Sequence, residues 1–405
     1  MLNWRDPRNP KAGGAERVTM AHLAGLVQRG HEAFWFANDF AGAEPEETLQ
    51  GIKIIRGGGY GTSVLAARKW YRHQPRFDLV IDQHHGIPWY APWWCGTRCA
   101  AYIHEVLGPI WGAFYSWPLS TIGRWQERWT HRLYRNIPFW TPSESTRRLL
   151  EQHGVRQVTV IANGTDARPL PALEDKPLAT PVRLIAVSRL APNKRVDHVL
   201  RATKVLFERG VPARLTVVGD GEEGQRLKAL AAELELGEAV TFTGPIEETA
   251  KDELLRQAHL LVHASLREGW GLNVIEANAM GTPAVVYPVG GLVDSTVHEK
   301  TGVVVANETP EAIAQAIETL LKVPEKYNFY RLNAWERSKS FQWEVVLPKV
   351  CEWLESLARQ RMSGDQQRRT PQASKVTKSS RPLSHLRRTS LRYPAKVLSS
   401  PSRPV

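Results

Sequence analysis

The sequence predicts an α/β protein with two doubly wound, parallel-sheet domains that face each other across a cleft, followed by a disordered basic tail. Short apolar runs alternate with amphipathic segments along most of the 405 residues, as is typical of parallel sheets covered on both faces. One polar, proline-bearing stretch interrupts this alternation near the middle. The length also suits two domains better than one.

The first predicted domain covers residues 1–166. It begins with an amphipathic helix over 14–30 and a strand over 32–37, which are two parts of a βαβ unit. Further strands are expected at 52–55, 78–81, 100–103, 139–141 and 158–161. Helical or loop segments separate these runs, so we expect a Rossmann-like sheet.

The segment 167–181, ARPLPALEDKPLATP, has no apolar period and is predicted to be the interdomain linker. The second domain covers 182–342 and repeats the alternation, again as a Rossmann-like unit. Its strands are expected at 184–187, 215–218, 240–242, 260–263, 284–287 and 303–305, and its helices at 196–209, 224–235, 250–257, 272–280 and 311–321. A closing helix over 343–361 ends the folded part.

Residues 362–405 form a tail rich in Ser, Arg and Pro. The tail holds ten Lys or Arg and one Asp, out of a formal charge of +12 for the whole chain, so the body is only mildly basic. Its few apolar residues cannot offset the entropy of ordering, and we predict disorder. The three cysteines fit neither a disulfide framework nor a two-pair zinc pattern. No apolar run is long enough to span a bilayer, and we expect a cytoplasmic protein.

The strongest motif is REGWGLNVIEANAMGTP at 267–283, where a strand leads through a glycine turn into a helix. Gly269 and Gly271 let the backbone approach a ligand closely, and the helix start near Leu272 favours an anion such as a diphosphate. Glu268 and Glu276 flank this turn, where they can accept hydrogen bonds from sugar hydroxyls. Spacing alone leaves exposed helix charges and a tight turn as an equal alternative.

The second motif is AVSRLAPNKRVDHVL at 186–200, a strand that ends in a loop with Arg189 and Lys194. Ligands of open α/β sheets bind outside the carboxyl ends of the strands, so both cations are placed to neutralise a diphosphate. Taken singly, each is more often a solvated surface charge.

The two glutamates eight positions apart in EGWGL…EA, with SRL…K before them, resemble the donor-binding half of the family 4 retaining glycosyltransferases, which have the GT-B fold. KAGGAERVTMAHLAGLVQRGHE at 11–32 resembles the family's glycine loop and first helix. VIANGTD at 160–166 resembles its interdomain segment. The likeness covers about 3–359 and omits the tail.

This resemblance implies a role for each matching residue. Glu276 would hold the ribose hydroxyls of a nucleotide-sugar donor, and Glu268 would contact the transferred sugar. Arg189 and Lys194 would bind the diphosphate. His104, in AAYIHEVLG, matches a histidine near the reacting carbon, although a lone histidine at a strand end is more often structural. Backbone amides would border the sugar and phosphates from both domains, namely those of Gly13, Gly14, Gly269, Trp270, Gly271 and Leu272.

The implied reaction transfers a hexose, with retention of configuration, from a GDP- or UDP-linked sugar to a carbohydrate or lipid-linked acceptor. The departing diphosphate needs fixed positive charge, which Arg189, Lys194 and the helix start supply. The chain has no Asp-x-Asp sequence, so we expect neither a metal nor a further cofactor. The base, sugar, acceptor and linkage do not follow from the motifs.

Two features depart from the family pattern or add to it. Only Met1 and Leu2 precede the segment at which the family's first strand ends, so that strand is expected to be cut short. The helical segment 123–135, GRWQERWTHRLYR, carries tryptophans and arginines that fit either an anionic membrane surface or an ordinary packed helix. We favour the packed helix and keep peripheral contact with the inner face of a membrane as an alternative.

Other activities fit the same architecture. A sugar-nucleotide epimerase or a phosphorylase has similar domains, and the phosphorylase would need a pyridoxal-phosphate lysine or free phosphate. The basic tail, with LRRTSLR at 386–392, would bind nucleic acid or another surface without specificity, since no aromatic stacking platform accompanies it. We expect no sequence-selective nucleic-acid binding.

Overall fold

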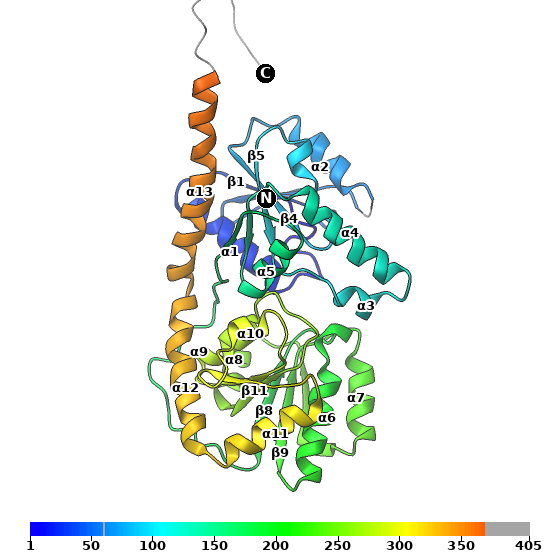
Figure 1. The fold of residues 1–405 in the computed structure, drawn as a ribbon, viewed down its shortest axis with the longest axis vertical. Coiled ribbons are helices and arrows are strands. Elements are labelled where there is room, and N and C mark those ends of the chain that lie inside the picture. Colours follow the sequence, from blue (N-terminus) through cyan, green and yellow to red (C-terminus); the bar gives the residue numbers. More distant parts are fainter. Residues whose placement is uncertain (60, 369–405) are drawn as a thin grey trace, which may run out of the picture. The chain divides into compact units, whose positions relative to one another are not determined.

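A computed structural model of the chain describes residues 1–59 and 61–368, with side chains up to residue 360. Residues 1–363 form one compact unit, in which the chain builds two α/β lobes (Figure 1). The predicted fold class of these lobes is confirmed. Residues 362–368 of the predicted tail continue the last helix, and residues 369–405 lie outside the described part, so the disorder predicted for them stays a prediction.

The N-terminal lobe alternates strands and helices from residue 1 to about 161. Its elements are α1 (Gly14–Gln28), β1 (Ala33–Ala37), β2 (Glu46–Leu49), β3 (Ile52–Arg56), α2 (Ser63–Tyr71), β4 (Leu79–His84), η1 (Ala91–Trp93), β5 (Arg98–Ile103), α3 (Ile110–Phe114), α4 (Leu119–Leu133), β6 (Phe139–Thr141), α5 (Glu144–Gln152) and β7 (Val158–Val160). The strands form two sheets, ordered β1-β3-β2 and β4-β5-β6-β7. All pairs are parallel except β2 with β3.

Leu2 joins these two sheets. It forms parallel bridges to Phe36 in β1 and to Asp82 in β4, and its amide donates to the carbonyl of Ile81 over 2.8 Å. Its side chain is buried with Phe36 and Val80. The first strand is therefore present as this short bridging segment between β1 and β4.

Residues 123–133 of the predicted helical segment 123–135 lie in α4, which ends at Leu133. The helix packs on the lobe, but not through its tryptophans, because Trp125 is 67% and Trp129 46% exposed. The helix buries Gly123, Glu127, Thr130 and His131 instead. Its apolar stripe thus faces away from the lobe.

The C-terminal lobe holds one parallel sheet of six strands, ordered β10-β9-β8-β11-β12-β13. Its elements are β8 (Val182–Val187), η2 (Pro192–Lys194), α6 (Val196–Glu208), β9 (Ala213–Val218), α7 (Gly224–Glu233), η3 (Gly237–Ala239), β10 (Val240–Gly244), α8 (Glu248–Gln257), β11 (Leu260–His263), α9 (Leu272–Ala279), β12 (Ala284–Val286), α10 (Leu292–Ser295), β13 (Gly302–Val304), α11 (Pro310–Leu321) and α12 (Pro324–Ser338). Buried aliphatic side chains from both faces of the sheet form its core.

The chain crosses between the lobes twice. The first crossing follows β7, and the segment up to β8 contains no helix or strand. The second passes through η4 (Lys339–Phe341) into α13 (Trp343–Arg368). The crossings lie side by side, because Thr165 pairs with Gln342 and a Cβ on Gly164 would lie 2.2 Å from the Trp343 ring.

Helix α13 returns to the N-terminal lobe, along which Figure 1 shows it running. Its Val346, Val350 and Leu354 are buried with Tyr102 and Trp140. Farther along, Glu355 accepts a hydrogen bond of 2.7 Å from Nε of Arg29. The last helix thereby fastens the end of the C-terminal lobe to the N-terminal one.

Candidate functional site

The candidate site lies where the strand order of the C-terminal sheet reverses. Strands β8 and β11 are neighbours in space, although β9 and β10 separate them in the chain. The loops that leave their carboxyl ends therefore diverge and leave a crevice, which is the usual ligand position in such sheets. Lys194 follows β8, and Glu268 follows β11.

Lys194 and Glu268 form a close ion pair with a separation of 2.6 Å between Nζ and Oε1. The same carboxylate oxygen accepts from the Ser265 hydroxyl at 2.6 Å and lies 3.0 Å from Nε2 of His263. Glu268 is thus held by two groups from its own loop and strand and by one from the β8 loop.

The electrostatics of this cluster favour an ionised glutamate. Burial alone would raise the pKa of Glu268, but the charge of Lys194 and hydrogen bonds from His263 and Lys194 lower it below its ordinary value. The Glu268 carboxylate and the Lys194 ammonium are therefore fixed side by side in a partly desolvated site. The carboxylate can accept a hydrogen bond from a sugar hydroxyl, and the ammonium can bind a phosphate.

Helix α9 begins at the same place. Gly271, its N-cap, has φ +83, a left-handed conformation that glycine adopts without strain. Asn273 in the first turn donates to the carbonyl of Val187 over 2.8 Å, so the helix start stands at the end of β8. Its unpaired amides and positive dipole end favour an anion at that point.

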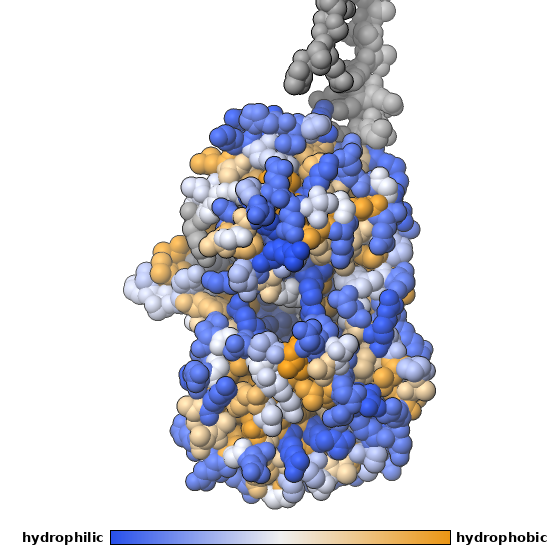
Figure 2. All heavy atoms as spheres, turned by 180° about the vertical axis from the view of Figure 1, so that it is seen from behind, coloured by the Kyte–Doolittle hydropathy of each residue, from blue (hydrophilic) through white to orange (hydrophobic). Residues whose placement is uncertain are grey.

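The N-terminal lobe closes this crevice from the other side. A Cβ on Gly269 would lie 2.7 Å from the carbonyl oxygen of His104, and one on Gly14 would lie 3.2 Å from Cδ1 of Leu272. These contacts bring the end of β5 and the start of α1 against the α9 loop. Figure 2 shows the surface hollowed between the two lobes.

The His104 side chain is half-buried at the end of β5. Its Nδ1 lies 3.3 Å from the Tyr102 hydroxyl, and its buried Nε2 has no hydrogen-bond partner among the described residues. Burial lowers the pKa of His104 to about 3, with a smaller contribution from His85. The imidazole is therefore neutral at physiological pH and has an unsatisfied nitrogen.

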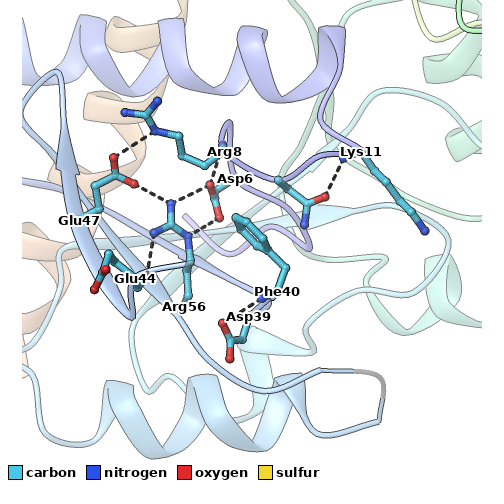
Figure 3. A network of polar contacts seen from close by, with 9 residues as sticks. Asp6, Arg8, Lys11, Asp39, Phe40, Glu44, Glu47 and Arg56 are labelled. Atoms are coloured by element: carbon cyan, nitrogen blue, oxygen red, sulfur yellow. Dashed lines mark hydrogen bonds and ion pairs between the residues drawn. The ribbon is translucent and has the colours of Figure 1, made fainter. Parts of the chain in front are cut away.

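The Gly13 backbone is held by the carboxylate of Glu16, which is itself paired with Arg5. The Gly13 amide donates to Oε2 of Glu16 over 2.7 Å, and Arg5 donates to Oε1 of the same glutamate over 3.0 Å. The segment before this loop is anchored by Arg56, whose guanidinium donates to Asp6 over 2.8 and 2.9 Å and to Glu47 over 2.8 Å (Figure 3). This network fixes where α1 starts.

Glu276 forms a second charged cluster on α9. Its carboxylate lies 2.9 Å from Nζ of Lys251 and 3.9 Å from the Arg17 guanidinium. Arg17 belongs to α1 of the N-terminal lobe and also pairs with Glu248 at the start of α8. The sequence motifs did not identify Lys251, Arg17 or Glu248, because only the tertiary fold brings them into one cluster with Glu276.

Two predicted residues contribute less directly. Arg189 is exposed and has no acidic partner within ion-pair distance in the described part of the chain. Burial, followed by the charges of Arg5 and Arg189, lowers the pKa of His85 to about 4, so Arg189 acts across to the N-terminal lobe. The Trp270 side chain is buried against Phe341 of the second crossing, which leaves only its backbone for a ligand.

Glu105 is a site residue that the motifs did not single out. One of its carboxyl oxygens is buried without a hydrogen-bond partner among the described residues. Burial, with the nearby charge of Glu268, raises the pKa of Glu105 to about 8. The available signal was its position directly after His104. Within the described residues, no group of three or more His, Cys, Asp or Glu is arranged to hold a metal ion.

Comparisons with known proteins divide the chain at the same place as the fold. The model of Glycosyltransferase Family 4 matches residues 12–168, and that of Glycosyl transferases group 1 matches 174–337. Glycogen synthase of Mycobacterium tuberculosis is 31% identical over 200 residues, which are 49% of this chain and 48% of that protein.

Two further proteins extend these similarities. The GDP-mannose-dependent alpha-(1-6)-phosphatidylinositol dimannoside mannosyltransferase of M. tuberculosis is 32% identical over 192 residues, 47% of this chain and 48% of that one. The chain thus spans about half the length of the curated relatives it matches. The crystal structure of Anabaena Alr3699/HepE in complex with UDP and glucose has a TM-score of 0.66 and 19% identity, covering 88% of this chain and 98% of that one. This likeness demonstrates a shared GT-B fold.

Proposed function

Because the chain belongs to the family 4 glycosyltransferases, we propose that it transfers a hexose from a nucleotide-diphosphate sugar to a carbohydrate or lipid-linked acceptor with retention of configuration. The observation that carries the proposal is the Lys194–Glu268 pair of 2.6 Å at the strand-order reversal. It joins a phosphate-binding charge and a hydroxyl-binding carboxylate in one crevice.

The donor would lie across the start of α9. Its diphosphate would meet Lys194, Arg189 and the first amides of the helix, while Glu276 would accept hydrogen bonds from the ribose. Glu268 would contact the transferred sugar. A GDP- or UDP-linked donor is supported by likeness alone, since one relative is named GDP-mannose-dependent and one structural neighbour binds UDP and glucose.

The reacting carbon would face the N-terminal lobe. As the glycosidic bond breaks, negative charge develops on the departing phosphate, and Lys194 and the helix start stabilise it. We therefore propose that the protein itself supplies the stabilising positive charge, without a metal ion or other cofactor. His104 lies against the same loop through its carbonyl, and its neutral imidazole has a free nitrogen to accept a hydrogen bond from the sugar.

The acceptor would approach from the N-terminal lobe, which brings His104 and the glycine loop to the crevice. In the described part of the chain, no helix combines the length and apolar character needed to cross a bilayer. We propose a cytoplasmic protein that contacts the inner face of a membrane peripherally.

The test is a panel of nucleoside diphosphates and their hexose conjugates, measured first by thermal shift and then by turnover with oligosaccharide and glycolipid acceptors. One nucleotide class should raise the melting temperature selectively, because a ligand that binds only the folded state stabilises it. The anomeric configuration of the product, read by NMR, tests retention.

Variants tie this activity to the crevice. Glu268→Gln should leave donor binding measurable and reduce turnover by a factor of at least about 100. Lys228→Ala, on the exposed side of α7, should match the unchanged protein. No stabilisation by any nucleoside diphosphate, or equal turnover in both variants, contradicts the proposal.

A further inference from the structure

Helices α3 and α4 expose an unusual number of large apolar side chains. Trp117, in the turn between them, is 81% exposed, and Trp125 on α4 is 67% exposed. We call the whole set the α3/α4 surface: Phe114, Tyr115, Trp117, Leu119, Ile122, Trp125, Trp129 and Leu133. Contiguous apolar patches of this kind on a folded protein mark interaction sites.

The spacing along α4 turns these side chains to one side of the helix. Ile122, Trp125, Trp129 and Leu133 follow one another at intervals of three or four residues, which is the repeat of a helical stripe. The orientation is fixed from beneath. Glu127 accepts from the amides of Leu107 and Gly108, and a Cβ on Gly123 would lie 2.4 Å from the Trp111 ring.

Four exposed arginines border the apolar stripe: Arg124, Arg128, Arg132 and Arg135. In the part of the chain that the structure describes, none of them has a carboxylate within ion-pair distance. The one acidic residue of α4, Glu127, is buried on the opposite side. The surface therefore presents tryptophans beside unneutralised positive charge.

This combination determines the kind of partner. Tryptophan rings are favoured where an apolar interior meets water, and arginines beside them attract anionic headgroups. We propose that the α3/α4 surface lies on an anionic phospholipid bilayer, with its apolar stripe in the headgroup boundary and its arginines against lipid phosphates. A protein groove would have to supply both a long apolar trough and a row of acids.

The position of the surface relates it to the crevice. Helix α3 contacts η2, the short turn that ends at Lys194, and Figure 1 shows α3 and α4 on the outer side of the N-terminal lobe. A bilayer on this surface would hold the lobe that receives the acceptor close to lipid. The inference rests on the proposed function only for this consequence, since lipid binding itself needs no turnover.

The experiment is sedimentation of the full chain with phosphatidylcholine vesicles and with vesicles that also contain phosphatidylglycerol. The unchanged protein should bind the anionic vesicles and be released by salt. Trp117→Ser/Trp125→Ser/Trp129→Ser should weaken that binding by a factor of at least about 1000, since burial of each of the three rings contributes more free energy than a tenfold change in affinity requires. Arg124→Gln/Arg128→Gln/Arg132→Gln should weaken it by about 100-fold, from about 1 kcal/mol for each cation near the surface.

Matched controls come from α2 and its C-cap, which expose Leu65, Arg68, Lys69 and Arg72 in the same lobe. Leu65→Ser and the triple variant Arg68→Gln/Lys69→Gln/Arg72→Gln should bind vesicles as the unchanged chain does. The basic tail is present in every variant, so a difference between them reports the α3/α4 surface. Circular dichroism and melting temperature establish that each variant is folded.

Two results would overturn the inference. One is equal binding to anionic vesicles by the tryptophan variant and the unchanged chain. The other is that the unchanged chain self-associates, the tryptophan variant is monomeric, and neither binds vesicles. That result would assign the α3/α4 surface to contact with a second copy of the chain. The thermal shift with nucleoside diphosphates is read on the same variants, so a failure of the proposed function is seen separately.

Discussion

The carbonyl oxygen of His104 faces Gly269 so closely that a Cβ on the glycine would lie 2.7 Å from it. His104 directly follows strand β5 of the N-terminal lobe, and Gly269 lies in the loop that leads into α9 of the C-terminal lobe. The absence of a side chain at position 269 is thus what allows the lobes to meet at the crevice.

We therefore expect Gly269→Ala to force these two backbones apart and to misplace reacting groups supplied by different lobes. Turnover should fall by a factor of about 100, because a displacement near 1 Å has that effect on aligned reactants. The melting temperature should change little, since each lobe keeps its own core. Gly112→Ala is the control, as a Cβ there meets no atom within 4 Å. Full activity of Gly269→Ala would show that the contact is not needed.

Lys194→Met should reduce kcat by a factor of about 100 to 1000, the usual loss when one donor that stabilises developing negative charge is removed. The substitution also removes a charge that lowers the pKa of Glu268. Lys194→Arg keeps the charge and should retain more activity. Steady-state kinetics with saturating donor make the comparison, and unchanged kcat in Lys194→Met would count against a role for this lysine at the diphosphate.

His22 should make the stability of the fold depend on pH. Burial, with a smaller effect of His104, lowers the pKa of His22 to about 3, whereas an unfolded histidine titrates near 6.5. Between these values the unfolded chain binds the proton and the folded one does not, so stability falls as the pH drops below about 6.5. At pH 5 the loss is about 2 kcal/mol.

His22→Phe should therefore reduce the difference in unfolding free energy between pH 7 and pH 5 by about 2 kcal/mol. Any change in packing affects both pH values and cancels in this comparison. His298→Phe, at an exposed position, should leave the difference unaltered. Urea unfolding at both pH values supplies the measurement, and an undiminished difference in His22→Phe would refute the assignment.

Arg56→Met should destabilise the N-terminal lobe by about 3–5 kcal/mol, because it leaves the Asp6 carboxylate buried without its partner. Both side chains of this pair are at most 1% exposed. Arg8→Met, which removes a 61% exposed partner of Glu47, should cost less than about 1 kcal/mol. The double variant Asp6→Asn/Arg56→Met should recover part of the lost free energy of unfolding. Denaturant unfolding measures these free energies, and strictly additive effects of the two substitutions would mean that the charges are independent.

The sequence predicted the C-terminal lobe well because its strands are continuous apolar runs. Strand β11, Leu260–His263, coincides with the predicted boundaries, and all its residues are buried. Strand β2 was not predicted because its EETL sequence is polar. It lies at a sheet edge, where its residues alternate between exposed and partly exposed. Its antiparallel pairing with β3 follows from a short connection that a parallel pair does not allow.

Within the site, local sequence located the loops but not the partners that cross between them. Lys194 and Glu268 were expected near one ligand, yet their direct contact depends on the adjacency of β8 and β11. The pairing of Arg17 with Glu248 joins residues 231 positions apart, which no spacing rule reaches. Periodicity likewise identified the stripe of α4 without indicating whether another element covers it.

The two crossings between the lobes lie side by side, with Thr165 paired to Gln342. Because both covalent connections lie at one edge, they act as a hinge that restricts the relative motion of the two lobes. Rotation about that edge is the least costly movement, and it opens the opposite rim most. A ligand would then enter and leave at the rim while the chain near Gly164 scarcely moves.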